Sequence, residues 1–519
     1  MIKVENYLLG MDCGTTNIKA IIIGEDGKII AEASRPSKFM IPKPNMQEQD
    51  ANEWWENTKE IFHSLAEQAG EEITNKIRGI SISSHTVSML PIDADGNPVR
   101  NAMTYQDNRS SKELDTILQK IGEEEFIQIV GGQPSVSFLP SKILWFKNNE
   151  PDLFAQTQCF LQASSFINFK LTRKLTMDVD QASRTQCLDI NTMKWSDKVG
   201  DVLGINLNEY LPQPVPVDDI IGFVTDDAAR ETGLVPGIPV VAGCSDAMAS
   251  MYALGLSHLG DAGESSGTSS LVFVGSANQS KPDVPVVTKP CAVDGMPWIF
   301  DAPITTTGAA IKWFIDTMAA EERLYCQQHN LNIYNYLNEL ALESKPGSNG
   351  LFFFPYLLGE RAPIWDEAAR GMFIGMGINT TRSDIIRSIF EGTAFALRNV
   401  METVKESGGE ANILRICGGG AKSYTWSQIK ASMLNIPVYL LDEASGDVPV
   451  GDALIVGYKV GVFEDLSKAV EQLIKVNDIV RPKEDWSRVY DQLYPYYVNM
   501  YQSLKDNLKS LKETMEYIY

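Results

Sequence analysis

The chain has 519 residues, which is long for a single domain and predicts two large ones. Hydrophobic residues make up 44% of the chain and charged residues 22%, a composition typical of a globular protein with a substantial core. The formal net charge of −22 disfavours nucleic acids and anionic membranes as partners, because both carry negative charge themselves.

Seven cysteines are scattered along the chain without a CxxC pair or a Cys/His cluster, so neither disulfides nor structural zinc are expected. A reducing, cytoplasmic setting is the simplest expectation. Asp12 interrupts the first apolar run, which disfavours a secretory signal. No apolar run approaches the ~20 residues that a membrane-spanning helix needs.

The first structured stretch is an apolar run up to Asp12, a turn of small and hydroxyl residues, and a second apolar run over Ile18–Ile23. This pattern predicts a strand, a tight loop and a returning strand. The loop offers backbone N–H groups, the hydroxyls of Thr15 and Thr16, and one carboxylate. Such a set can hold a phosphate and a hydrated Mg²⁺. An ordinary hairpin with polar turn residues explains the stretch equally well.

A third strand is expected at Ile29–Ala31, followed by an amphipathic helix from a capping-box-like Asp50–Glu53 to about Ala69. A strand at Ile77–Ser83 comes next, with His85 just past its end. Strand, helix and strand in this order predict an α/β domain with a mixed sheet.

Residues 110–212 are expected to be mostly helical and to end in a rigid proline-rich connector. A buried strand at Ile238–Gly243 then brings Cys244, Ser245 and Asp246 to its carboxyl end. A helix is expected at Ala247–Leu256.

Near residue 260 the pattern starts again. Gly263–Ser270 is expected as a second Gly-Thr loop, leading into a strand at Leu271–Gly275. Two similar hairpins about 250 residues apart predict a duplicated architecture. A later strand at Ile413–Cys417 leads into a glycine-rich loop, Gly418–Ser423. From about Trp486 the chain is expected to form a surface helix.

Other well-known motifs are missing. Gly418–Ser423 is not a P-loop, because Ala421 rather than a glycine precedes Lys422. The dinucleotide-binding GxGxxG spacing also fails there. Four histidines make a multi-histidine metal site improbable, and neither GxSxG nor HExxH occurs in the sequence.

Taken together, the loops resemble those of the FGGY carbohydrate kinases, within the actin, hexokinase and Hsp70 fold group. The resemblance runs from the Asp12 loop to about Gly457. Four segments carry it: Gly10–Thr16 is similar to the first phosphate loop, Gly243–Asp246 to the segment with the catalytic aspartate, Gly267–Thr268 to the second phosphate loop, and Gly418–Ser423 to the adenosine loop.

Two longer family signatures support the resemblance. Residues Gly371–Glu391 fit the C-terminal signature at every position. Residues Lys142–Asn149 fit most of the N-terminal signature, although Leu139 stands where a small or hydroxyl residue is usual.

The resemblance implies an α/β fold of two ribonuclease-H-like (actin-like ATPase) domains that face each other across a cleft. Residues 1–258 would form the N-terminal, sugar-binding domain with the catalytic aspartate. Residues 259–485 would form the C-terminal, ATP-binding domain, and residues 486–519 a C-terminal helical extension.

The implied activity is an ATP-dependent, Mg²⁺-requiring transfer of the γ-phosphate to a sugar hydroxyl. Asp246 would be the catalytic base, with a helix N-cap aspartate as the alternative. Asp12, with a simple turn aspartate as the alternative, would hold Mg²⁺ together with Asp246. Because two nearby carboxylates repel each other, the site should be poorly formed without a divalent cation.

The resemblance also implies binding residues. The nucleotide would be bound by Thr15, Thr16, Gly267, Thr268, Gly308, Gly419, Gly420 and Ala421. The sugar would be bound by His85, Asp107 and Arg109 together with Asp246. The alternatives are ordinary turn and helix-cap chemistry for the first set, a satisfied core histidine for His85, and a surface ion pair for Asp107 and Arg109.

The implied substrate is a ketopentose of the xylulose type. The Gly-Glu-Arg-x-Pro core within Gly359–Asp366 suits xylulokinases, whereas Ala362 and Ile364-Trp365 favour gluconokinases, so gluconate is the main alternative. Other pentuloses and polyols stay open.

Two further classes share these nucleotide loops. One is an actin-like or Hsp70-like ATPase without a sugar substrate. The other is an inactive sugar sensor, which is disfavoured because Asp12 and Asp246 are both present. The expected partners are a small sugar and ATP, without nucleic acid or membrane. The oligomeric state is open, with a homodimer among the alternatives.

Overall fold

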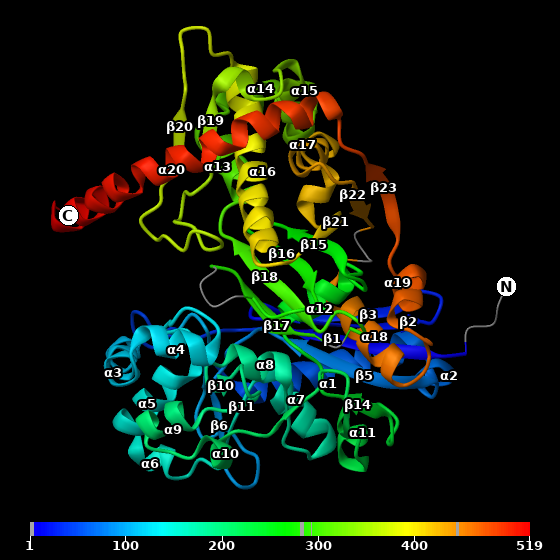
Figure 1. Cartoon of the computed structure of the whole chain (residues 1–519). Helices are drawn as coiled ribbons and strands as arrows, with labels where there is room; N and C mark the ends of the chain where they lie inside the picture. Colours follow the sequence, from blue (N-terminus) through cyan, green and yellow to red (C-terminus); the bar gives the residue numbers. More distant parts are fainter. Residues whose placement is uncertain (1–4, 281–284, 292, 443–445, 519) are drawn as a thin grey trace. The chain divides into compact units, whose positions relative to one another are not determined.

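The computed structural model describes residues 5–280, 285–291, 293–442 and 446–518 of the chain. Its described residues form two compact units (Figure 1). Unit 1 comprises Met1–Ser257, Lys289–Pro297 and Asp447–Ile474, and unit 2 comprises His258–Thr288, Trp298–Gly446 and Lys475–Tyr519. The division predicted from the sequence takes each domain as one continuous stretch, whereas unit 1 includes two segments from later in the chain.

Unit 1 is built on a six-stranded mixed sheet in the order β13-β14-β5-β1-β2-β3. The first three strands form the predicted antiparallel hairpins, and β5 and β14 run parallel to β1. The strands are β1 (Tyr7–Cys13), β2 (Asn17–Gly24), β3 (Ile29–Pro36), β5 (Ile77–Ser84), β13 (Ile220–Phe223) and β14 (Pro239–Val241).

The sheet of unit 2 repeats this pairing pattern. It has seven strands in the order β17-β18-β16-β15-β21-β22-β23. As in unit 1, a pair of antiparallel hairpins is followed by two parallel strands and an antiparallel edge strand, which confirms the predicted duplication. The strands are β15 (Gly260–Ser266), β16 (Ser270–Ser276), β17 (Val287–Pro290), β18 (Trp298–Ile304), β21 (Ala411–Cys417), β22 (Val438–Leu441) and β23 (Val476–Val480).

Two helices of unit 1 matter most for the site. Helix α1 (Ala51–Ala69) begins at the predicted cap, where the Asp50 side chain accepts from the Asn52 N–H. Helix α18 (Val448–Lys459) packs on β1 because Gly10 has no side chain: a Cβ there would lie 1.9 Å from the Pro449 carbonyl oxygen. Gly451 of α18 meets the backbone of α12 (Asp246–Ala253) equally closely, since its Cβ would lie 1.9 Å from the Ala249 oxygen.

The remaining elements cover these sheets or form small subdomains. The mostly helical character predicted for residues 110–212 is confirmed, with short strand pairs added. In unit 1 they are α2 (Glu71–Thr74), α3 (Ser111–Ile121), α4 (Glu123–Val130), α5 (Leu139–Asn149), α6 (Pro151–Phe154), α7 (Ala163–Thr172), α8 (Val179–Arg184), α9 (Asp197–Leu203), α10 (Leu207–Tyr210), α11 (Asp226–Thr232), α19 (Leu466–Leu473), β4 (Glu48–Gln49), β6 (Leu90–Ile92), β7 (Ala102–Met103), β8 (Cys159–Leu161), β9 (Met177–Asp178), β10 (Leu188–Asp189), β11 (Lys194–Trp195) and β12 (Pro214–Val215). In unit 2 they are α13 (Gly308–Thr317), α14 (Ala320–His329), α15 (Ile333–Glu343), α16 (Arg382–Glu406), α17 (Tyr424–Leu434), α20 (Glu484–Ile518), β19 (Phe352–Phe354), β20 (Met372–Ile374) and the 3₁₀ turns Ser348–Gly350 and Gly419–Lys422.

Two local predictions were wrong. Gly263–Ser266, expected as loop, is the end of β15, because its backbone pairs with β16 on one side and β21 on the other. The turn is therefore confined to residues 267–269. Helix α20 is also not a simple surface helix: Tyr490, Tyr497 and Tyr501 are buried in the core of unit 2, and only its later part is largely exposed.

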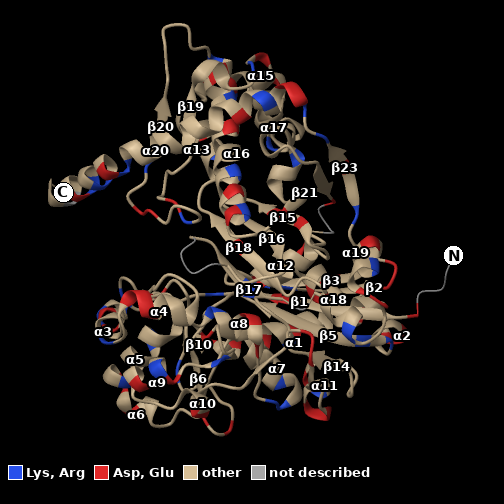
Figure 2. Ribbon diagram, viewed as in Figure 1, with Lys and Arg blue, Asp and Glu red and all other residues tan. Residues whose placement is uncertain are grey.

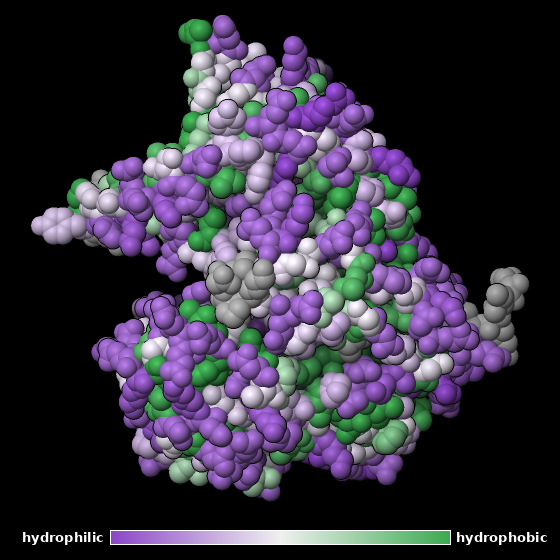
Figure 3. Space-filling view, viewed as in Figure 1, coloured by the Kyte–Doolittle hydropathy of each residue, from purple (hydrophilic) through white to green (hydrophobic). Residues whose placement is uncertain are grey.

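The surface carries mixed charge. Along α20, basic and acidic residues are interspersed (Figure 2). The face shown in Figure 3 is largely hydrophilic, with scattered hydrophobic patches. Within the described ranges, no helix combines the length and the apolar character that crossing a bilayer requires. Among the described residues, the seven cysteines form no disulfide bonds.

Candidate active site

Asp12 and Asp246 come together in unit 1. Asp12 lies near the end of β1, and Asp246 is the first residue of α12, just after β14. Burial raises the pKa of the Asp12 carboxyl well above its usual range, and the carboxylates of Asp246 and Asp447 raise it further. This end of the sheet therefore concentrates negative charge.

The N-cap of helix α12 is Ser245 and not Asp246, which the sequence alone allows as a possible cap. Ser245 caps α12 by accepting from the Met248 N–H at 3.1 Å, while Asp246 Oδ1 accepts from the adjacent Ala247 N–H at 2.7 Å. Asp180 holds the preceding turn, because its Oδ2 accepts from both the N–H and the hydroxyl of Ser245 at 3.0 and 2.5 Å. The N-cap interpretation of Asp246 is thus wrong, and its carboxylate is partly exposed.

The residues present fit a sparsely ligated Mg²⁺. Among the described residues, no group of three or more His, Cys, Asp or Glu side chains is arranged to hold a metal. Mg²⁺ at phosphoryl-transfer sites commonly keeps several waters and uses only one or two carboxylates besides the substrate phosphates. Asp12 Oδ1 suits this role, because it is buried and has no hydrogen-bond partner in the described part of the chain.

His85 is a buried and fully hydrogen-bonded residue. Its Nδ1 lies 2.9 Å from the Cys13 carbonyl oxygen, and its Nε2 lies 2.6 Å from Ser88 Oγ. Burial lowers the pKa of the imidazole to about 4, so it is neutral near pH 7. Since a carbonyl only accepts, Nδ1 carries the proton and Nε2 accepts from Ser88. The geometry matches the core-histidine alternative and ties the end of β5 to β1 beside Asp12.

Asp107 and Arg109 form a buried ion pair rather than a surface one. Asp107 accepts from the Gln47 N–H at 2.7 Å and from Arg109 Nε at 2.8 Å. Arg109 also reaches Glu48 at 2.7 Å and lies over the Trp145 ring at 4.9 Å. Both oxygens of Asp107 already accept hydrogen bonds from protein groups, so the ion pair holds the neighbouring backbone of unit 1 in place.

The turn with Thr15 and Thr16 is anchored through its carbonyl groups. The Thr15 oxygen accepts from Gln49 Nε2 at 2.8 Å, and the Thr16 oxygen accepts from the Ser37 N–H at 3.0 Å. Thr16 is exposed and Thr15 half-buried. The turn is therefore held from behind while its outer side stays accessible.

The nucleotide residues predicted for unit 2 gather around the exposed turn Gly267–Thr268. The Gly308 N–H donates to the Gly267 oxygen at 3.1 Å, and a Cβ on Gly308 would lie only 2.4 Å from that oxygen. Gly420 approaches from another side, since its Cβ would lie 2.1 Å from Ser266 Oγ. Gly419 and Ala421 flank it in the same 3₁₀ turn.

Three buried residues near the predicted site residues, one in unit 1 and two in unit 2, were not predicted. Asp452 of α18 accepts from the hydroxyls of Ser83 and Ser81 at 2.7 and 3.2 Å, and burial raises the pKa of its carboxyl well above the usual range. Glu264 and Lys430 form a buried ion pair in unit 2. Each pair joins residues far apart in the sequence, so local patterns carry no sign of them.

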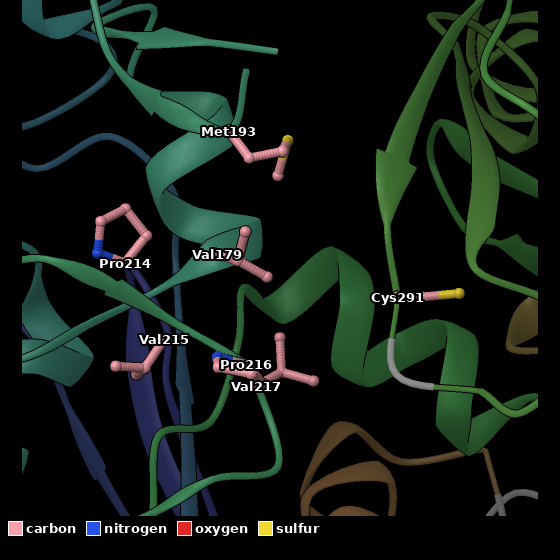
Figure 4. Close-up of a pocket in the computed structure, with 7 residues that line it drawn as sticks. All are labelled: Val179, Met193, Pro214, Val215, Pro216, Val217 and Cys291. Atoms are coloured by element: carbon pink, nitrogen blue, oxygen red, sulfur yellow. The ribbon is translucent and has the colours of Figure 1, made fainter. Parts of the chain in front are cut away.

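A separate cavity of about 300 Å³ lies in unit 1 (Figure 4). Val179 and Val217 point toward its space, and Cys291 borders it from a different segment. Its other lining residues are Met193, Pro214, Val215 and Pro216. None of the predicted site residues lines it, so it is distinct from the carboxylate site.

Comparison with known proteins covers nearly the whole chain. Residues 7–253 match the N-terminal domain of the FGGY family of carbohydrate kinases, and residues 264–460 match its C-terminal domain. The xylulose kinase of Staphylococcus epidermidis is 30% identical over 514 residues, which cover 97% of this chain and 98% of that protein. The gluconokinase of Bacillus subtilis is 25% identical, with 98% of each chain covered.

Solved structures show the same fold. The crystal structure of the xylulose kinase from Rhodospirillum rubrum matches with a TM-score of 0.88 at 26% identity, covering 97% of this chain and all of the other. This confirms the predicted two-domain α/β fold, with both signature-bearing halves in the order that the sequence suggests. The chain therefore belongs to the FGGY family of carbohydrate kinases.

Proposed function

We propose that this chain is a xylulose kinase, which transfers the γ-phosphate of Mg²⁺-ATP to a terminal hydroxyl of a ketopentose. The main support is the placement, in unit 1, of the partly exposed Asp246 near Asp12, whose Oδ1 has no hydrogen-bond partner among the described residues. The similarity to xylulose kinases over both halves of the chain supports the substrate.

Asp246 is the proposed general base. A sugar hydroxyl is a weak nucleophile, and a carboxylate can accept its proton as the oxygen attacks the γ-phosphorus. Its place at the first position of α12 is fixed, because Ser245 supplies the cap and Asp180 holds the turn before it. Asp12, with Asp246 nearby, would hold Mg²⁺, which would neutralise phosphate charge when bound.

The turns with Thr15-Thr16 and Gly267-Thr268 are the proposed phosphate loops. Short turns of glycine and threonine present N–H and hydroxyl donors, which suit phosphate oxygens. Gly308, Gly419, Gly420 and Ala421 are proposed to let adenosine approach the backbone, since they have little or no side chain.

We assign a positioning role to three of the predicted sugar residues, namely His85, Asp107 and Arg109. Their polar atoms are already paired within unit 1, so they are proposed to fix the walls of the sugar site rather than to bind hydroxyls as they stand.

Gluconate is the second candidate substrate. The gluconokinase of Bacillus subtilis is similar over 98% of each chain, and the segment Ala362–Trp365 favours that group. Trp365 is held in unit 2 by a hydrogen bond from its Nε1 to the Pro285 oxygen at 2.7 Å.

The function is tested by measuring ADP release with Mg²⁺-ATP across D-xylulose, L-xylulose, D-ribulose, L-ribulose, gluconate, glycerol and erythritol, with Asp246→Ala as the control. Strong stimulation by xylulose that the variant lacks is the expected result. Stimulation by gluconate alone would identify gluconate as the substrate in place of xylulose. A slow rate of ADP release that no sugar changes would favour an ATPase.

A further inference from the structure

A buried ion pair lies directly beneath the nucleotide loops of unit 2. Lys430 of α17 donates to both carboxylate oxygens of Glu264 on β15, at 2.9 and 2.7 Å, and the side chains are 2% and 1% exposed. The ammonium group also lies 4.0 Å from the centre of the Trp426 ring. The free energy lost when two charges are removed from water cancels much of their mutual attraction. A contribution to stability is therefore a weak explanation for such a buried pair.

A chain of hydrogen bonds connects the ion pair to these loops. Ser270 Oγ lies 2.7 Å from Glu264 Oε1 and 3.0 Å from Thr307 Oγ1. Because a serine has one hydroxyl proton and a carboxylate only accepts, Ser270 donates to Glu264 and accepts from Thr307. The Thr307 N–H in turn donates to the Thr268 oxygen at 3.2 Å. The ion pair thus connects to the turn after β15 and to the start of α13.

The glycine-rich loop after β21 joins the same network. Lys430 Nζ lies 3.4 Å from Ser266 Oγ, the atom against which Gly420 packs without room for a Cβ. Burial lowers the pKa of Lys430, while Glu264 opposes that shift, so the carboxylate of Glu264 helps to keep Lys430 charged. The three segments of unit 2 that are proposed to hold the nucleotide therefore all meet one buried pair.

We propose that Glu264 and Lys430 are positioning residues for the nucleotide. They touch neither the sugar nor the transferred phosphate, and they act by holding the Gly267–Thr268 turn, the start of α13 and the loop with Gly420 in one arrangement. The inference depends on the proposed function only in taking these loops as the nucleotide site.

The test is direct titration of Mg²⁺-ADP, without sugar, into wild type, Glu264→Gln, Lys430→Met and the double variant. Each single change leaves a buried polar group without its partner, so ADP affinity is expected to fall at least about tenfold. The double variant should recover most of that loss. With sugar present, KM for ATP should rise while kcat at saturating ATP stays within about twofold.

A matched control is the buried pair Arg387–Glu391 on α16 of the same unit, with atoms 2.6 Å apart. Glu391→Gln is expected to lower the melting temperature and to leave ADP affinity within about twofold of wild type. An equal loss of ADP affinity in this control would reduce the effect to general destabilisation and overturn the proposal.

A milder variant covers the case in which the charge changes prevent folding. Ser270→Ala keeps the ion pair but removes its link to Thr307, and it should also weaken ADP binding. Wild-type ADP affinity in Ser270→Ala, or in a folded Glu264→Gln, would overturn the proposal. Because no sugar is used, failure to phosphorylate xylulose would contradict the proposed substrate and leave this outcome unaffected.

Discussion

Asp12 and Asp246 lie near enough within unit 1 that the charge of Asp246 raises the pKa of Asp12. Asp447 adds to the effect, and Lys19 at 2.6 Å from Asp447 offsets part of that negative charge. The site thus holds two carboxylates that repel each other when both are ionised. A divalent cation would relieve this repulsion, which gives the proposed metal role a direct test.

Asp246→Asn is expected to keep the fold and ADP binding while kcat falls by about 10²–10⁴, the usual contribution of a general base. The matched control is Asp226→Asn, because Asp226 holds the same first helical position in α11, after the cap Thr225, and is exposed. Turnover of both variants is measured with the best sugar. Near-normal turnover in Asp246→Asn would contradict the general-base role.

Asp12→Asn is expected to raise the melting temperature of the ligand-free protein at pH 8 by a few degrees. The reason is that burial disfavours the ionised form of this carboxyl, so its raised pKa lowers the stability of the folded state at pH values above the ordinary aspartate pKa. The same change should weaken the Mg²⁺ dependence of turnover. Melting curves and Mg²⁺ titrations at fixed ATP measure both effects, and an unchanged Mg²⁺ titration would rule out the metal role.

The lowered pKa of His85 predicts a pH dependence of stability. Between about pH 6.5 and 4 the unfolded chain takes up a proton at this imidazole while the folded protein does not. Wild type should therefore lose about 3 kcal/mol of unfolding free energy over this range relative to His85→Gln. Urea unfolding at several pH values measures the difference. The exposed His63→Gln is the control, and an equal pH slope in wild type and His85→Gln would contradict the prediction.

Gly308→Ala should weaken nucleotide binding by forcing the second phosphate loop to move. The new Cβ would lie 2.4 Å from the Gly267 oxygen, and backbone cannot yield as a flexible side chain can. We expect the free energy of unfolding to fall by about 1–3 kcal/mol. The affinity for ADP should fall by about tenfold or more. Gly377→Ala is the control, because a Cβ there meets nothing within 4 Å. Equal ADP affinity in both variants would contradict the loop assignment.

The sequence was most informative where structure is local. The hairpins around Asp12 follow from apolar runs broken by short turns, and α1 follows from its cap and its helical spacing. A loop is wrongly predicted for Gly263–Ser266 because small polar residues are typical of loops. Its strand identity comes from two neighbouring strands, and one of them, β21, lies about 150 residues away.

Much of the site could not be predicted for the same reason. The partners of Asp452 lie more than 350 residues away, and those of Lys430 more than 160. The alternative in which Asp246 caps the helix failed for a different reason, since Ser245 beside it is an equally good cap and only the backbone geometry selects one.

Helix α18 completes unit 1, although it is translated much later than most of that unit. Residues Asp447–Ile474 belong to unit 1, yet the ribosome makes them about 190 residues after Ser257. At synthesis rates of about 5–20 residues per second, roughly 10–40 seconds pass between the synthesis of Ser257 and that of the helix that covers β1. A fragment that stops at residue 257 would lack the helix that packs on Gly10, so unit 1 should need most of unit 2 to be translated before it can fold completely.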